Sequence, residues 1–124
     1  MVGRILIMDD EKYVRWALKE HLRGCGFSIF EASDTKAALE IMEGLLFDAV
    51  LLDVELLEHQ GALFIQKFKN FPKQPHVFLV SKEDLKHHKN LALDWGARGF
   101  IKKPFRISEI NELLEKVLRD VNYP

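Results

Sequence analysis

The chain has one cysteine, no long apolar run and almost no net charge, and each of these absences narrows its class. Cys25 is the only cysteine among 124 residues, so no disulfide can form within one chain, which fits the reducing cytosol. No stretch approaches the roughly 18 apolar residues of a membrane span, and the apolar run before Asp9 is too short for a signal peptide. The formal net charge of −1 argues against bulk nucleic acid or an anionic membrane as the main partner. We therefore expect a cytoplasmic protein without a membrane partner.

Composition indicates a folded domain of ordinary size. Apolar residues make up 48% and charged residues 30% of the chain, close to the average of globular proteins. A length of 124 residues is typical of one domain, which we expect to cover residues 1–124.

Short apolar runs alternate with longer amphipathic stretches along the chain. The runs predict strands over residues 4–8, 27–32, 48–53, 76–80 and 98–101. The stretches predict helices over 11–25, from a cap at Ser33 or Asp34 to 45, over 61–71, over 85–95 and from 108 onward. This alternation predicts an α/β fold in which helices cover both faces of a five-stranded parallel sheet. We expect the doubly wound, flavodoxin-like (βα)5 arrangement with strand order 2-1-3-4-5, in which ligands bind beyond the carboxyl ends of the strands.

Acidic residues stand where the first and third apolar runs end. Asp9 and Asp10 follow the first run, and Asp53 closes the third. At about 4 Å and an effective dielectric near 20, two carboxylates repel by on the order of 4 kcal/mol. A divalent cation relieves this repulsion, and oxygen ligands favour Mg²⁺. The expected sheet brings Ser81 and Lys103, which follow the fourth and fifth runs, to the same edge.

These groups together suit the handling of a phosphoryl group. A carboxylate such as Asp53 can form an aspartyl-phosphate, Mg²⁺ neutralises charge on the transferring oxygens, and a lysine offers a compact positive charge. Taken singly, Asp9-Asp10 and Ser81 are explained as helix caps and Lys103 as a surface lysine. Their combination at one edge favours a functional site.

Five sequence elements, in order along the chain, carry a family resemblance. They are Asp9-Asp10, Asp53, Gly61, Ser81 and Lys103-Pro104-Phe105. With these elements at the ends of the expected strands, the chain resembles the receiver domain of bacterial two-component response regulators over essentially its whole length. The stretch Val14–Leu18 is weakly similar to receivers of enhancer-binding transcriptional activators.

The resemblance implies a catalytic or switching role for four residues. Asp53 would be the phospho-acceptor, Lys103 would pair with the phosphoryl group, and Ser81 would hydrogen-bond to it. Ser81 would move toward the phosphoryl group and Phe100 would swing into the vacated space. Phe100 lacks the tyrosine hydroxyl that is common at this position, and plain core packing explains it equally well.

The resemblance also implies a Mg²⁺ site. Asp10 and Asp53 would bind the ion directly, Asp9 would act partly through water, and the backbone carbonyl of Glu55 would complete the protein ligands. The Lys103-Pro104 peptide bond is usually cis in this family.

The implied activity is that of a switch with weak self-phosphorylation and autodephosphorylation, and not that of a metabolic enzyme. A sensor histidine kinase or a phosphotransfer protein would supply the phosphoryl group. The surface formed by the fourth helix, the fifth strand and the fifth helix would then change its partner, either an output domain or a second copy of the chain. We expect no direct nucleic-acid binding by this domain. A stand-alone receiver and the N-terminal part of a transcriptional regulator are both compatible with the sequence.

The segment after Asp53 departs from the family pattern at two positions. Leu57 stands where proline is frequent, and Gln60 stands where an acid often precedes the glycine. We therefore expect the loop from Asp53 to Gly61 to be less rigid, or to present Leu56-Leu57 to a partner.

Charged residues near the expected phosphorylation site form a second departure. Lys82 stands where a small residue is usual, and Glu55 and Glu83 flank the site. We expect this charge pattern to tune dephosphorylation. Nearby, His87 and His88 lie in a basic run, and because adjacent helical residues face different ways we expect a solvated face there.

Three other functions use a similar fold or similar residues. A small Mg²⁺-dependent phosphatase would use an aspartyl-phosphate on Asp9, with Glu11 as the second acid. A pure interaction domain would keep the fold without turning over phosphate. A flavodoxin-like electron carrier needs a phosphate-binding loop rich in glycine and hydroxyl groups after the first strand, and the sequence has none there.

Overall fold

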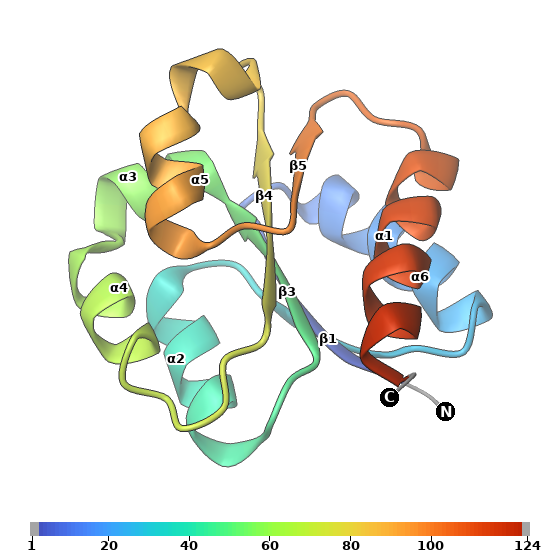
Figure 1. Cartoon of the computed structure of the whole chain (residues 1–124), viewed down its shortest axis with the longest axis horizontal. Helices are drawn as coiled ribbons and strands as arrows, with labels where there is room; N and C mark the ends of the chain where they lie inside the picture. The colour runs from blue at the N-terminus through green and yellow to red at the C-terminus, as the bar shows by residue number, and fades with distance from the viewer. Residues whose placement is uncertain (1–2, 123–124) are drawn as a thin grey trace.

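The five apolar runs form the strands of one parallel sheet in the computed structural model, which describes the backbone of residues 3–122 and the side chains of residues 3–116. The strands are β1 (Arg4–Met8), β2 (Ser28–Ala32), β3 (Ala49–Asp53), β4 (His76–Ser81) and β5 (Gly99–Lys102). Neighbouring strands are parallel. Their order, β2-β1-β3-β4-β5, confirms the predicted topology (Figure 1).

Helices cover both faces of the sheet. They are α1 (Lys12–Gly24), α2 (Thr35–Gly44), α3 (Val54–Gln60), α4 (Ala62–Phe68), α5 (Lys89–Trp95) and α6 (Ile107–Asn122), with a 3₁₀ turn, η1, at Leu85–His87. Helices α1 and α6 pack on one face, and α2, α3, α4 and α5 pack on the other (Figure 1).

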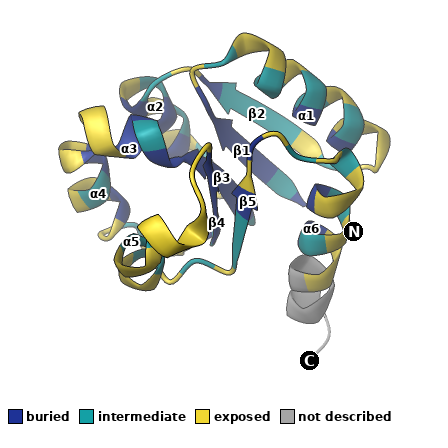
Figure 2. Cartoon of the chain, turned by 90° about the horizontal axis from the view of Figure 1, so that it is seen from above, coloured by how far each residue is buried: buried dark blue, intermediate teal, exposed yellow. Residues whose placement is uncertain are grey.

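The central strands are buried on both faces because their side chains alternate between two cores. In β1, Leu6 and Met8 belong to the core under α2–α4, whereas Ile5 and Ile7 belong to the core under α1 and α6. All four are at most 1% exposed, and Figure 2 shows the central strands as the most deeply buried part of the fold. The carboxyl ends of β1 and β3 are therefore held by packing from both sides. In contrast, α5, every residue of which is described, has no fully buried residue.

The expected loop after Asp53 is wrong, because residues 54–60 form α3. The Asp53 carboxylate caps this helix by accepting hydrogen bonds from the backbone amides of Glu55 and Leu56, at 2.9 and 3.3 Å. Leu56 and Leu57 are 6% and 3% exposed, so they pack in the core and do not face a partner. With leucine in place of proline at position 57, the segment can continue as a helix.

Gln60 ties the end of α3 to the start of α2. Its backbone carbonyl and its side-chain oxygen accept hydrogen bonds from Thr35 Oγ1 at 3.0 and 3.2 Å. The side-chain oxygen also accepts from the Thr35 amide at 3.1 Å. The segment that follows Asp53 is therefore anchored at both ends.

The expected single helix over 85–95 is also wrong. Residues 85–87 form η1, and α5 begins only at Lys89, with His88 between them in a non-helical conformation. Because of this break, the side chain of His88 turns toward the sheet and is 9% exposed, which makes the expected solvated face wrong at this position.

Candidate functional site

Four polar side chains are buried together beyond the carboxyl ends of the strands. Asp9 follows β1, Asp53 ends β3, Ser81 ends β4 and Lys103 follows β5. Each of them is at most 8% exposed. Since burying a polar group is unfavourable unless it has partners, their gathering at one edge marks this edge as the candidate site.

Three aspartates form the acidic part of the site. Asp9, Asp10 and Asp53 each offer a carboxylate oxygen, and these oxygens lie within 4.8 Å of one another. Asp10 is exposed and the other two are buried. An all-oxygen set that opens to solvent on one side is the kind of site that binds Mg²⁺, which keeps several of its waters. The residues present therefore fit the predicted ion.

Lys103 is the cation inside this acidic cluster. Its Nζ lies 2.8 Å from Asp9 Oδ2, 3.0 Å from Glu11 Oε1 and 3.4 Å from Asp53 Oδ2. Burial alone would lower the pKa of Lys103, but hydrogen bonds and the charges of its carboxylate partners raise it above its ordinary value. Lys103 is therefore protonated throughout the physiological range. The peptide bond between Lys103 and Pro104 is cis, as predicted.

The pKa of Asp53 shows that negative charge is in excess at this site. Burial, and next the charge of Asp9, raise its pKa to about 6, although Lys103 acts in the opposite direction. One ammonium among several carboxylates leaves an excess of negative charge, and this excess is what a divalent cation would neutralise.

The two oxygens of Asp53 have different surroundings. Oδ1 accepts the two amide hydrogen bonds that cap α3. Oδ2 faces the Lys103 ammonium. A carboxylate that is fixed through one oxygen and presents the other beside a cation is well oriented for nucleophilic attack.

Glu55, the fourth predicted metal ligand, lies in the first turn of α3. Its side-chain Oε1 accepts a hydrogen bond from the Lys82 amide at 2.9 Å. Its backbone carbonyl belongs to a helix, where carbonyls point toward the amide four residues later and away from the N-terminal cap. Binding of the ion by this carbonyl stays a prediction.

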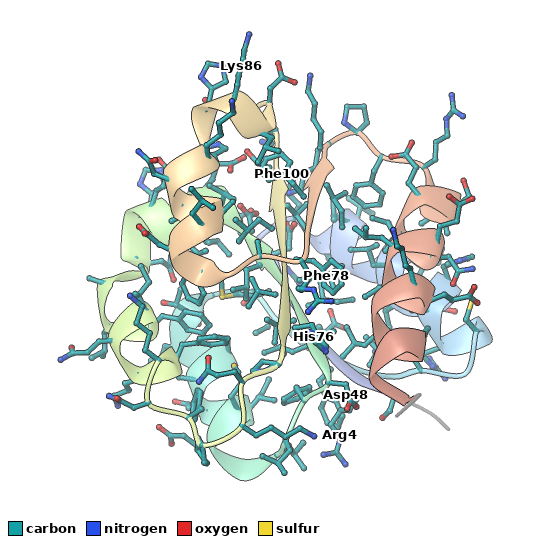
Figure 3. The ribbon with its side chains drawn as sticks, viewed as in Figure 1. Arg4, Asp48, His76, Phe78, Lys86 and Phe100 are labelled. Atoms are coloured by element: carbon teal, nitrogen blue, oxygen red, sulfur yellow. The ribbon has the colours of Figure 1, made fainter. Side chains whose placement is uncertain are left out.

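Ser81 reaches the predicted edge, but its hydroxyl bonds to residues outside the acidic cluster. Ser81 Oγ accepts a hydrogen bond from the Glu83 amide at 3.0 Å and lies 3.2 Å from His88 Nε2. The ring of His88 stacks on Phe100, with 6.0 Å between centroids. Phe100 is half-buried, contacts the core under α2–α4 and lies beside β4 on β5 (Figure 3). The two predicted switch residues are therefore joined through a histidine.

Sequence reasoning missed the roles of Glu11 and His88. Glu11 completes the run of acids after β1, so its position was a signal that it could reach the same cation. His88 carried no such signal, because its inward orientation depends on the break between η1 and α5. Over the described residues, no helix is long and apolar enough to span a bilayer.

Comparison with known proteins places these features in a family. Residues 5–115 match the model of the response regulator receiver domain. The KDP operon transcriptional regulatory protein KdpE of Escherichia coli is 31% identical over 115 residues, which are 93% of this chain and 51% of that protein. The alkaline phosphatase synthesis transcriptional regulatory protein PhoP of Bacillus subtilis is 29% identical over 96% of this chain and 50% of its own length. The chain thus spans about half the length of these relatives.

Solved structures share the same fold. A two-component response regulator from Clostridium difficile aligns with a TM-score of 0.86 and 22% identity, over 97% of this chain and 98% of that one. The response regulator TrrA from Thermotoga maritima, solved in complex with Mg²⁺-BeF, aligns with a TM-score of 0.77 and 28% identity, over 94% of this chain and 99% of that one. The family match covers nearly all of the strands and helices described above, and the chain belongs to the response regulator receiver domain family.

Proposed function

We propose that Asp53 is the phospho-acceptor of this receiver domain and that its phosphorylation changes which partner the domain binds. The family supplies the general role, a phosphoacceptor in two-component signal transduction. The observation that carries the assignment to Asp53 is its geometry: Oδ1 is fixed by the amides of α3 while Oδ2 faces Lys103 Nζ at 3.4 Å.

The transfer uses groups that the fold already holds in place. A histidine kinase or a phosphotransfer protein presents a phosphohistidine, and Asp53 Oδ2 attacks its phosphorus in line. The new P–O bond forms as the P–N bond breaks, and the electron pair returns to the ring nitrogen, which takes up a proton. The Lys103 ammonium pairs with one phosphoryl oxygen. Asp9, Asp10 and Asp53, with the Glu55 carbonyl, would hold Mg²⁺, which would neutralise charge at the phosphoryl oxygens.

Ser81 and Phe100 carry the change away from the site. The Ser81 hydroxyl leaves His88 and donates a hydrogen bond to a phosphoryl oxygen. Phe100 loses its stacking contact with His88 and moves inward. Because α5, β5 and α6 adjoin these two residues, their common surface changes its partner preference. An output domain or a second copy of the chain is the partner proposed for this surface.

The domain acts as a switch: besides accepting the phosphoryl group, it carries out weak self-phosphorylation and autodephosphorylation. Relatives twice as long bear the names of transcriptional regulators, which supports a role as the N-terminal part of such a regulator. A cytoplasmic location fits this role, because the kinase domain and the output must both be within reach.

The test is labelling of the full chain by acetyl phosphate in the presence of Mg²⁺. Mass spectrometry should show the gain of one phosphoryl group in the parent and none in Asp53→Asn. Asp34→Asn is a matched control, because Asp34 also caps a helix, by accepting from the Ala37 amide at 2.7 Å, and asparagine caps equally well. Labelling that persists in Asp53→Asn would overturn the assignment. Turnover of an aryl phosphate that depends on Asp9 would favour the phosphatase instead.

A further inference from the structure

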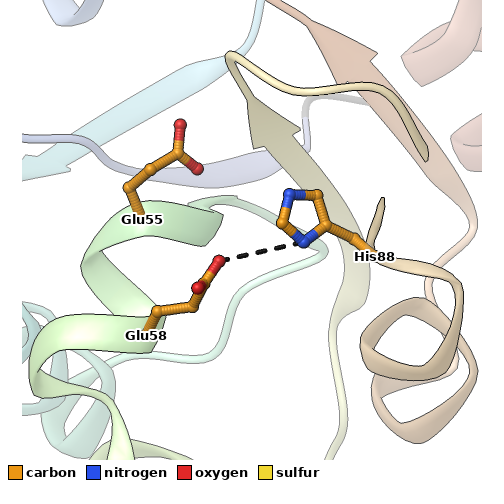
Figure 4. A group of neighbouring side chains, drawn as sticks. All are labelled: Glu55, Glu58 and His88. Carbon is orange, nitrogen blue, oxygen red and sulfur yellow. Dashed lines mark ion pairs between the residues drawn. The ribbon is translucent and has the colours of Figure 1, made fainter. Parts of the chain in front are cut away.

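Two glutamates and a histidine meet outside the phosphorylation site. Glu55 and Glu58 lie about one turn apart on α3, and His88 faces them from the junction between η1 and α5 (Figure 4). One potential ligand atom of each residue lies within 4.8 Å of the other two. We propose that Glu55, Glu58 and His88 form a second metal site, which takes a transition-metal dication such as Zn²⁺.

The donor set separates this site from the acidic cluster. Asp9, Asp10 and Asp53 offer only oxygen, which suits Mg²⁺, whereas an imidazole together with carboxylates suits Zn²⁺ and its neighbours in the first transition row. Glu55 and Glu58 are three positions apart on a helix, a spacing that places both side chains on one face. The helix and the facing histidine therefore hold their ligands on opposite sides of one point.

The spacing between His88 and Glu58 suits a bridging ion better than a direct bond. His88 Nδ1 and Glu58 Oε1 are 3.8 Å apart, beyond the upper range of about 3.2 Å for an N–H···O hydrogen bond. Two ligands of a tetrahedral Zn²⁺, each about 2.1 Å from the metal, lie roughly 3.4 Å from each other. A small rotation of the Glu58 side chain closes this difference.

The other nitrogen of His88 is held as that of a metal-bound histidine is. Nε2 lies 3.2 Å from Ser81 Oγ, which already accepts the Glu83 amide. With Nε2–H donating to the Ser81 oxygen, the lone pair is on Nδ1 and points at Glu58. Metal-binding histidines characteristically donate their second N–H to a fixed acceptor, which sets the tautomer and the ring orientation. The ring also faces Phe100, with 28° between the two ring planes, and this contact restricts its rotation.

An unsatisfied oxygen and an open path complete the case. Glu55 Oε2 is buried and has no hydrogen-bond partner among the described residues, and leaving such an atom unpaired is unfavourable. A groove whose lining includes Glu58, Glu83 and His88 reaches two of the three proposed ligands. Glu83 Oε2 lies 3.8 Å from His88 Nε2 and adds negative charge, whereas Lys86, on the same groove, extends outward from the molecule (Figure 3).

Binding at this site has a consequence for the switch, which rests on the proposed function. A metal on Nδ1 fixes the His88 ring, and the fixed ring keeps its Nε2–H on Ser81. Ser81 must leave that bond to reach a phosphoryl group on Asp53. Zn²⁺ therefore favours the unphosphorylated arrangement and slows phosphorylation.

Calorimetric titration of Zn²⁺ into the full chain, with Mg²⁺ in excess to fill the acidic cluster, tests the site directly. We expect one equivalent to bind, and both His88→Gln and Glu58→Gln to weaken binding by on the order of tenfold or more. His87→Gln is the matched control, because His87 is exposed and adjacent but outside the cluster, and it should bind as the parent does. Asp53→Asn should also keep the site, which separates this result from the fate of the proposed phospho-acceptor. Absence of binding, or equal binding in His88→Gln, would overturn the proposal.

Nitrogen NMR of the histidine rings gives a second readout that does not depend on variant folding. Zn²⁺ should shift the Nδ1 resonance of His88 while Nε2 keeps its proton, and unchanged ring resonances would contradict the site. The effect on switching is measured as the rate of acetyl phosphate labelling with one equivalent of Zn²⁺. The rate should fall severalfold in the parent and stay constant in His88→Gln. If Zn²⁺ binds but the rates in the parent do not change, the link to Ser81 is wrong and the site alone stands.

Discussion

Lys103 is the residue on which the charge balance of the site depends. It contacts Asp9, Glu11 and Asp53, and its hydrogen bond is the largest of the causes that lower the pKa of Glu11. Even so, it does not offset the burial of Asp53 and the neighbouring charge of Asp9, so the pKa of Asp53 stays raised. The unphosphorylated site is therefore a source of instability that its function requires.

Replacing Asp53 by asparagine should stabilise the fold in buffer without Mg²⁺, in a way that depends on pH. The pKa of Asp53 is raised from 3.8 to about 6, so its contribution to stability is fully present below pH 3.8 and is lost as the pH rises through 6. At pH 7–8 the Asn variant should exceed the parent in free energy of unfolding by about 2–3 kcal/mol, a difference that vanishes near pH 4. Urea denaturation across this pH range measures the effect. A constant difference at all pH values would contradict it.

Magnesium should remove the greater stability of the Asp53→Asn variant over the parent. Because the ion binds the ionised carboxylates, millimolar Mg²⁺ at pH 7.5 should raise the midpoint of thermal unfolding of the parent. The Asp53→Asn variant, which lacks one of the ligands, should respond much less. Calcium-free buffers with and without EDTA provide the comparison, and an equal shift in both proteins would place the bound ion elsewhere.

The charges at positions 82 and 83 should set the lifetime of the phosphorylated state. Lys82 Nζ lies 3.5 Å from Glu11 Oε1, at the mouth of the acidic cluster, and Glu83 binds Ser81 through its amide. We expect Lys82→Ala to speed the loss of phosphate and Glu83→Ala to slow it, each about two- to fivefold, the size of an exposed charge interaction. The rates are measured as the loss of phosphorylated protein with time after acetyl phosphate is removed. Rates equal to that of the parent in both variants would contradict this prediction.

At the scale of single elements, α3 and α5 are where sequence and structure disagree. The seven residues of α3 are too few to show a helical period, and their helix forms because Asp53 caps it and Leu56 and Leu57 are buried. The break at His88 depends likewise on its contacts with Ser81 and Phe100. Both outcomes depend on residues distant in sequence, so local patterns could not predict them.

Gly61 should tolerate no side chain, because it joins α3 to α4. A Cβ at this position would collide with the backbone carbonyl of Leu57, and neither backbone can move without displacing a buried leucine. We expect Gly61→Ala to lower the free energy of unfolding by about 1–3 kcal/mol. Gly44→Ala is the control, since nothing lies within 4 Å of its Cβ position, and it should be neutral or stabilising by up to about 1 kcal/mol. Urea denaturation of both variants decides, and equal stabilities would refute the steric argument.

At the scale of the whole molecule, the arrangement of strands was predictable and the bonding of individual side chains was not. Apolar runs and the rules for parallel sheets were sufficient for the order of the five strands, and this order brings Asp9, Asp10, Asp53 and Lys103 together. The same rules place Ser81 at the edge but do not say which neighbour its hydroxyl binds. Such choices are made by packing around the site, after the topology is fixed.

Signalling through the fold should be visible at Trp95 and not at Trp16. Trp95 packs on Phe68 and Phe64, with ring centroids 4.9 and 6.0 Å apart, and lies on α5. Trp16 is 63% exposed on α1. Addition of Mg²⁺ and beryllium fluoride should change the tryptophan fluorescence of the parent and of Trp16→Phe, but not of Trp95→Phe. A response that disappears with Trp16 instead would move the conformational change away from α5.

The incomplete burial of α5 lowers the free energy that phosphorylation must supply to move this helix. The helix contributes no fully buried residue to either core, and only partly buried side chains such as Trp95 connect it to the core. Shifting it therefore disturbs less packing than shifting a central strand would. Elements of this kind open at low free energy, and their amide protons exchange with solvent before those of the rest of the fold. A modification that rearranges only a few hydrogen bonds can therefore move this helix. The same free energy would not displace β1 or β3, which are buried on both faces.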